Sequence, residues 1–145
     1  MDGPLVVTLL VISALEAVGA DYFIGGSLAS GIHGLGRATM DADLVAPLGE
    51  GQVQALIDML GPDFYADAGM IHEAIRLQRS FNLIHLPTMF KVDVFILGAS
   101  PFHAEQMRRR RRELLDPATG ETAYFAAPED VILAKLAAGG LRQDT

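Results

Sequence analysis

A single aspartate inside an apolar run constrains the fold of this chain more than any other feature. The run from Phe90 to Leu97 has the composition of a β-strand and holds Asp93 in its interior. In a strand the two flanking valines face the opposite side, which leaves Asp93 on the face shared with Lys91 and Phe95. A buried, unpaired charge is costly, so this carboxylate requires a partner, solvent or a metal ion. For an isolated aspartate, an exposed strand face is the simpler interpretation.

A pair of aspartates lies earlier in the chain, at the start of a second β-rich run. Asp41 to Ala46 reads as a strand that ends before Pro47, and side chains two positions apart on a strand share a face. Asp41 and Asp43 should therefore project together and repel each other unless a proton or a cation lies between them. Mg²⁺ suits such a site, because it takes one or two carboxylates together with phosphate oxygens. A solvent-facing turn is the alternative for this pair alone.

A glycine-rich turn precedes this pair. Tyr22 to Ile24 reads as a short strand, and Gly25-Gly26-Ser27 follows it, with Ser27 as the N-cap of a short helix over residues 28–33. Glycines at a strand-to-helix turn let backbone N–H groups approach phosphate oxygens, and a helix N-terminus adds partial positive charge. The alternative is a flexible turn.

The remaining elements alternate irregularly between helix and strand. They predict an α/β fold in a single domain with a mixed sheet. We expect helices over Pro4–Val18, Gln52–Leu60, Met70–Arg79, Pro101–Leu114 and Pro128–Ala138, and strands over Phe81–Leu86, Phe90–Leu97 (joined by a hairpin at Pro87-Thr88-Met89) and Thr122–Phe125.

Composition narrows the possible functions. Of the 145 residues 50% are hydrophobic and 20% charged, which allows a sizeable core in one domain. A formal net charge of -7 argues against a general polyanion binder, although bound cations can still create a nucleotide site. The absence of cysteine excludes disulfides, thiolate catalysis and zinc held by sulfur.

The apolar run near the N-terminus, residues 5–12, reads as a buried helix rather than a signal peptide or a membrane anchor. The residues before it include Asp2 but no Lys or Arg, and the run is too short to span a bilayer. We therefore expect a cytoplasmic protein without a membrane partner.

Together these elements resemble the nucleotidyltransferase superfamily to which DNA polymerase beta belongs. The resemblance rests on Ile24-Gly25-Gly26-Ser27, a spacer, Arg37 to Leu44, and Val92-Asp93-Val94. More narrowly, GGSLASGIHGLGRATMDADLV, FNLIHLPTMFKVDVFI and PEDVILAKL are similar to blocks of the small bacterial branch that includes minimal nucleotidyltransferases and AbiEii-type toxins. The resemblance implies a nucleotidyltransferase-type mixed sheet flanked by helices over residues 1–145. The chain would be either a minimal member of the superfamily or one that lacks a further C-terminal helical segment.

The resemblance also implies a mechanism. Asp41 and Asp43 would hold the Mg²⁺ (or Mn²⁺) that bridges a nucleoside triphosphate (NTP). Asp93 would help to bind a second metal and activate the acceptor hydroxyl, so that attack on the α-phosphate expels pyrophosphate. Gly25, Gly26 and Ser27 would bind the phosphates.

Other residues have weaker claims. Arg37 and Thr39 could reach phosphate or orient the carboxylates, and Lys135 on the last helix could meet the triphosphate; ordinary loop and surface roles are the alternatives. The arginines over 108–112 could steer an RNA or an acidic protein, but such a run is more often the wet end of a helix. The four histidines have no metal-ligand spacing.

The sequence leaves the acceptor open. A protein hydroxyl, a tRNA 3′ end and a small molecule are all compatible with the resemblance, which also implies a toxin–antitoxin setting with a cognate partner protein. The alternative is a catalytically silent nucleotide-binding or protein-interaction module of the same fold. Three intact aspartates favour the enzyme.

Overall fold

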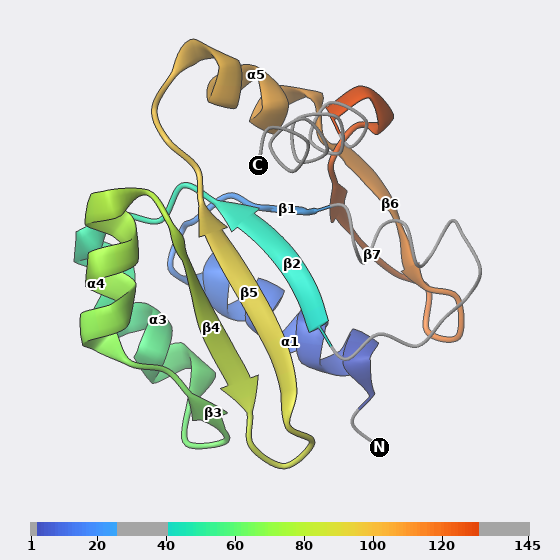
Figure 1. Ribbon diagram of the computed structural model, residues 1–145. Helices are drawn as coiled ribbons and strands as arrows, with labels where there is room; N and C mark the ends of the chain where they lie inside the picture. Colours follow the sequence, from blue (N-terminus) through green and yellow to red (C-terminus); the bar gives the residue numbers. More distant parts are fainter. Residues whose placement is uncertain (1–2, 26–40, 131–145) are drawn as a thin grey trace, which may run out of the picture.

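The computed structural model describes residues 3–25 and 41–130, and within them a seven-stranded mixed sheet forms the centre (Figure 1). The strand order is β3-β4-β5-β2-β1-β7-β6. Two strand pairs, β2 with β5 and β1 with β7, are parallel, and the others are antiparallel. The strands are β1 (Phe23–Ile24), β2 (Asp41–Ala46), β3 (Phe64–Tyr65), β4 (Ser80–His85), β5 (Phe90–Ile96), β6 (Arg111–Asp116) and β7 (Glu121–Phe125). The predicted α/β class with a mixed sheet in a single domain is confirmed.

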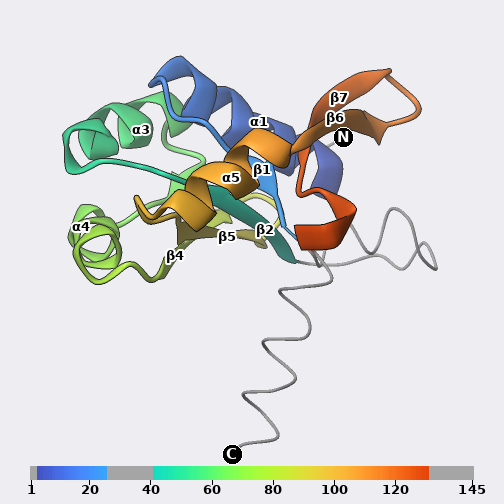
Figure 2. The ribbon, with the colours of Figure 1, turned by 90° about the horizontal axis from the view of Figure 1, so that it is seen from above.

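Helices cover one face of the central strands. Figure 2 shows α1 (Pro4–Ala17) and α3 (Val53–Leu60) on the same side of β2 and β5. Helix α4 (Ala68–Leu77) packs against β4, and α5 (Pro101–Arg109) follows β5; a short 3₁₀ turn, Glu50–Gln52, precedes α3. None of the described helices is both long enough and apolar enough to cross a lipid bilayer.

The core lies between α1, α3 and the covered face of the sheet. Strand alternation sends every second side chain of the central strands into it. These side chains are buried: Ala42, Leu44 and Ala46 of β2, Phe81 and Leu83 of β4, and Val92 and Val94 of β5. Opposite them, Leu15 of α1 and Leu56 of α3 are fully buried. Truncating such a leucine to alanine costs about 2–5 kcal/mol, so this layer fixes which face of each strand points outward.

Most predicted boundaries agree with the structure to within two residues, because residues at the helix ends determine them. Helix α1 begins with Pro4 in its first turn and ends before Gly19, whose φ of +80° suits glycine. Helix α4 begins at Ala68, earlier than predicted, because the Asp67 side chain accepts a hydrogen bond from the Met70 N–H and caps it. Residues 128–130 are helical as predicted, while the rest of that helix and the helix over 28–33 lie outside the described residues.

The prediction of a helix over Pro101–Leu114 is wrong in its second half. Helix α5 ends at Arg109, and the chain continues as strand β6. Arg110 makes the break: its backbone is extended, and its guanidinium donates to the carbonyl of Tyr22 at 2.9 Å and lies 3.9 Å from the centre of the Tyr124 ring. Pairing with β7 therefore overrides the helical preference of the arginines. The two-residue strand β3 was not predicted.

Candidate functional site

One row of residues crosses the sheet at its centre. In the parallel pair β2–β5, Asp43 and Asp93 are direct partners, and in the antiparallel pair β4–β5 Asn82 is the partner of Asp93. Partners in register project to the same face, and the alternation places this row on the face opposite the core. The structure thus brings together two aspartates that lie 50 positions apart in the sequence.

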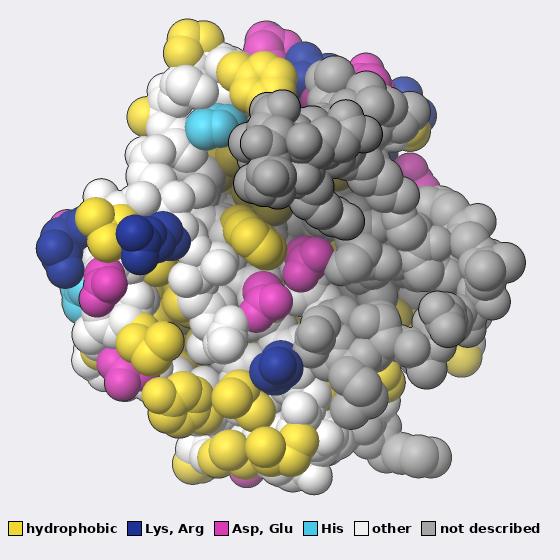
Figure 3. Space-filling view, viewed as in Figure 1, with side chains coloured by type: hydrophobic (Ala, Val, Ile, Leu, Met, Phe, Trp, Pro, Cys, Tyr) yellow, Lys and Arg dark blue, Asp and Glu magenta, His cyan; other side chains and the backbone are white. Residues whose placement is uncertain are grey.

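The two carboxylates are partly exposed in the middle of the sheet's outer face. Figure 3 shows acidic side chains gathered over the centre of this face, with a basic and an apolar side chain close by. Asp43 and Asp93 are each intermediate in exposure, and neighbouring strands lie about 4.8 Å apart. At that spacing two negative charges disfavour each other unless a cation or a hydrogen-bond donor lies between them.

Gly25 adjoins the acidic row on the β1 side. Its N–H donates to the carbonyl of Asp43 at 2.8 Å, so the backbone of residue 25 continues the antiparallel pairing beyond β1. A Cβ placed on Gly25 would lie 3.4 Å from Cβ of Asp43. The predicted glycine turn therefore begins directly beside an acidic side chain.

The predicted site residues divide into those the structure brings together and those it does not describe. Asp43, Asp93 and Gly25 are neighbours at the centre of the sheet, because Asp43 pairs with Asp93 on one side and with the backbone of Gly25 on the other. The backbone of Asp41 pairs with Lys91, but the Asp41 side chain lies outside the described part of the structure. The other predicted residues also lie outside it: Gly26, Ser27, Arg37, Thr39 and Lys135.

The side chains of this row suit a magnesium ion, which needs few ligands from the protein, better than a structural metal ion held by protein ligands alone. Among the side chains that the structure describes, which do not include that of Asp41, no three His, Cys, Asp or Glu residues gather as a metal-binding group. Asp43 and Asp93 supply two partly exposed carboxylates. That number matches Mg²⁺, which keeps waters and completes its shell with substrate phosphates. A structural zinc site would need four ligands from the protein.

Sequence reasoning missed Asn82. The signal was available, because Asn82 is the polar position in the alternating run Phe81-Asn82-Leu83, and the predicted hairpin makes this run the neighbour of β5; the exact register, which decides the partner of Asp93, was not predicted. The antiparallel hairpin β4–β5 places its amide on the outer face next to Asp93. An amide there offers both a donor and an acceptor beside the carboxylates.

The arginine run serves the fold. Arg109 donates two hydrogen bonds to the buried carboxylate of Asp130, at 2.7 and 3.2 Å, and this hydrogen bonding raises the pKa of the Arg109 guanidinium. Arg108 pairs with Glu105. Arg110 and Arg112 both lie over the ring of Tyr124, at 3.9 and 4.4 Å from its centre. Four of the five guanidinium groups are thus engaged within the domain, which favours the structural interpretation over an RNA-steering strip.

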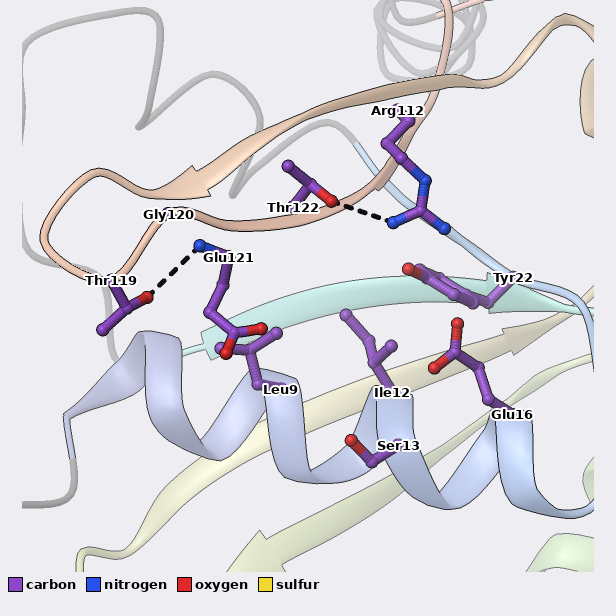
Figure 4. A pocket seen from close by; sticks show the side chains of 10 residues that line it. All are labelled: Leu9, Ile12, Ser13, Glu16, Tyr22, Arg112, Thr119, Gly120, Glu121 and Thr122. Atoms are coloured by element: carbon purple, nitrogen blue, oxygen red, sulfur yellow. Dashed lines mark hydrogen bonds between the residues drawn. The ribbon is translucent and has the colours of Figure 1, made fainter.

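A polar hollow of about 420 Å³ lies elsewhere, between α1 and the β6–β7 hairpin (Figure 4). It is on the helix side of the sheet and does not include Asp43 or Asp93. Several of its polar groups already have partners: Arg112 donates to Thr122 at 2.9 Å, and the Tyr22 hydroxyl accepts from the Tyr124 N–H at 3.1 Å. Burial raises the pKa of Tyr22, so its hydroxyl stays protonated at neutral pH. This hollow offers no substitute for the acidic row.

The described histidines have local roles. The His72 ring contacts Glu50 at 3.1 Å and the buried His85 ring contacts Thr88 at 2.8 Å. At His103 it is the backbone N–H that donates to the Ser100 side chain, the N-cap of α5. His33 lies outside the described residues.

Comparison with known proteins adds no further constraint. No protein-family model matches the chain, and no curated protein matches it significantly.

Proposed function

We propose that this protein is a metal-dependent nucleotidyltransferase, which transfers a nucleoside monophosphate from an NTP to a hydroxyl group. The observation that carries the proposal is the register of β2 and β5, which makes Asp43 and Asp93 direct, partly exposed neighbours on the outer face of the sheet. Two adjacent carboxylates placed where solvent and substrate can reach them suit a metal–triphosphate complex better than they suit stability.

Asp43, with Asp41 as a further predicted ligand, would hold the metal that binds the triphosphate, whereas Asp93 would serve the acceptor hydroxyl. Bound Mg²⁺ would polarise the α-phosphate and neutralise charge on the leaving group. In the transfer, the acceptor oxygen forms a bond to the α-phosphorus, and the bond from that phosphorus to the bridging oxygen breaks. Pyrophosphate leaves, and the hydroxyl proton passes to the carboxylate of Asp93.

The backbone at Gly25 supports the phosphate side of this assignment. Its missing side chain keeps the space beside Asp43 open, so a phosphate group can approach the acidic row from the β1 side. Gly26 and Ser27, as predicted phosphate ligands, would continue that side. A cytoplasmic location, where NTPs are available, belongs to this proposal, and the lack of cysteine is compatible with it.

The test is transfer of label from α-³²P NTPs. Purified protein is incubated with each of the four NTPs, Mg²⁺ and an extract that supplies proteins, RNAs and small metabolites. We expect labelled acceptor and released pyrophosphate, both abolished by EDTA and by the double variant Asp43→Asn with Asp93→Asn. Asp58→Asn, at an exposed position of α3, is the matched control and should retain activity.

The outcome also separates the enzyme from a silent module. Magnesium-dependent NTP binding without label in any fraction and without pyrophosphate release would replace the enzyme with a nucleotide-binding module. The identity of the labelled molecule would choose among a protein hydroxyl, a tRNA end and a small molecule. A cognate toxin or antitoxin partner should co-purify with the protein from its native cells.

A further inference from the structure

An aromatic ring lies exposed beside the acidic row. Phe95 follows Asp93 by two positions on β5, so its side chain is on the same face, and it is 43% exposed. The Cα atoms of residues two apart on a strand are about 6.6 Å from each other. Most aromatic side chains of this size are buried, because their burial supplies much of the core stability. An exposed ring next to a candidate site is therefore a candidate contact for a flat ligand.

The surroundings of Phe95 are polar on one side. Its partner on β4 is Ser80, and the next outward-facing residue of β4 is Asn82, the partner of Asp93. Both Ser80 and Asn82 are exposed. Strands β4 and β5 thus present a ring with hydrogen-bonding groups alongside it.

This group lies on one side of the acidic pair, and the glycine turn lies on the other. The order β4-β5-β2-β1 places Phe95, Ser80 and Asn82 over β4 and β5, while Gly25 adjoins β2 from the β1 side (Figure 1). If the triphosphate occupies the glycine side, the second substrate has to approach Asp93 from the β4–β5 side.

We propose that Phe95 and Asn82 form the acceptor subsite of this enzyme, which rests on the proposed nucleotidyltransferase function. Phe95 stacks against a flat ring of the acceptor, and Asn82 hydrogen-bonds to the part of the acceptor that carries the hydroxyl. Base–aromatic stacking has this form in many nucleic-acid binding proteins.

The separation of Phe95 from Asp93 selects the class of acceptor. In a phenol the hydroxyl is attached directly to the ring. If that ring stacks on Phe95, the phenol oxygen does not reach Asp93. In a nucleoside the sugar separates the ring from the hydroxyl and bridges the distance between the two residues. The acceptor is therefore a flat ring carried on a saturated ring that bears the reactive hydroxyl.

Binding of adenosine, the simplest probe of this class, tests the proposal. Adenosine is titrated by NMR into the protein saturated with Mg²⁺ and a non-hydrolysable NTP analogue, which fills the donor side. We expect Phe95→Ala to weaken adenosine binding about tenfold, Phe95→Tyr to retain it, and Asn82→Ala to weaken it severalfold. Tyr65→Ala is the matched control, because Tyr65 is 44% exposed at the β3 edge of the same sheet.

Calorimetry of the NTP analogue with each variant completes the test, and its affinity should stay within twofold of wild type. Adenosine that does not bind, or that binds Phe95→Ala as well as wild type, overturns the proposal. So does a Phe95→Ala variant that loses affinity for the NTP analogue, because the ring would then serve the donor. Tyrosinamide that binds in a Phe95-dependent manner would overturn the acceptor class. Wild-type protein that binds no NTP analogue would instead refute the proposed function itself.

Discussion

At the scale of single residues, Asp43 and Asp93 occupy equivalent places in the row but have different neighbours. Asp43 adjoins the backbone of Gly25, whereas Asp93 adjoins Asn82 and the exposed Phe95. Under the proposed function, this asymmetry divides the work between the two carboxylates. One belongs to the triphosphate side, and the other belongs to the side from which the acceptor approaches.

Asparagine substitutions should separate these roles. Asp43→Asn should reduce transfer at least about 100-fold and also weaken magnesium-dependent NTP binding, because it removes a charge from the triphosphate side. Asp93→Asn should reduce transfer as strongly yet leave most of the NTP affinity. Label transfer rates and calorimetric NTP titrations of both variants provide the measurement.

Asparagine keeps the size and shape of the side chain, so both variants should fold. Their circular dichroism spectra and melting temperatures, compared with those of Asp58→Asn, control for this. Full activity in either variant would mean that the carboxylates belong to an ordinary strand surface.

At the scale of secondary-structure elements, the end of β1 depends on a residue with no side chain. A Cβ at Gly25 would be in ordinary contact with Asp43, but the extra methyl groups of a branched side chain would press on that residue. Gly25→Val should therefore lower transfer about tenfold or more and destabilise the fold by about 1–3 kcal/mol.

Gly51→Val is the control for this change, because nothing lies within 4 Å of a Cβ at Gly51. Transfer assays and chemical denaturation of both variants test the expectation. Unchanged transfer in Gly25→Val would show that the approach to Asp43 from β1 plays no part in catalysis.

The elements that the sequence predicts well are those whose own pattern decides their structure. Helix α1 has a proline start and a glycine stop, and β5 alternates around Asp93. Strand β6 has no such pattern: Arg110 is fixed by the carbonyl of Tyr22, which lies 88 positions away. Contacts between distant residues cannot be read from the local run of arginines, so the helix was extended too far.

The candidate site was predictable in content but not in arrangement. The alternation within β2 and β5 identifies Asp43 and Asp93 as outward-facing side chains. Neither run states that the two strands are neighbours, that they are parallel, or that residue 43 stands opposite residue 93. The order and register of β2 and β5 depend on how the whole sheet packs against α1 and α3. For Asn82 the predicted hairpin supplies the neighbouring strand, and only the register that places it opposite Asp93 was missing.

At the scale of the whole molecule, the protein is acidic, with a formal net charge of -7, and two of its aspartates are partly exposed neighbours on the sheet. Ligands that bind only the folded state raise its stability by mass action. Mg²⁺ with an NTP should therefore raise the melting temperature by roughly 5–10 °C at about 100 times the dissociation constant. Either component alone should produce a smaller shift.

Thermal unfolding with ATP, GTP, CTP and UTP, each with Mg²⁺ or with EDTA, measures this joint effect. The Asp43→Asn variant should lose most of it. No shift with any of the four nucleotides would contradict a triphosphate site.

Under the proposed function, the parallel register of β2 and β5 also makes activity depend on correct folding. A slip of one residue on either strand would turn its aspartate toward α1 and expose the leucine or valine beside it. Such a slipped sheet would bury a charge in the apolar layer, so the misregistered state is heavily disfavoured. The buried leucines and valines of these strands therefore also select the register in which Asp43 and Asp93 are neighbours. Under the proposed function, substitutions that weaken this core would therefore also disturb the alignment of Asp43 and Asp93.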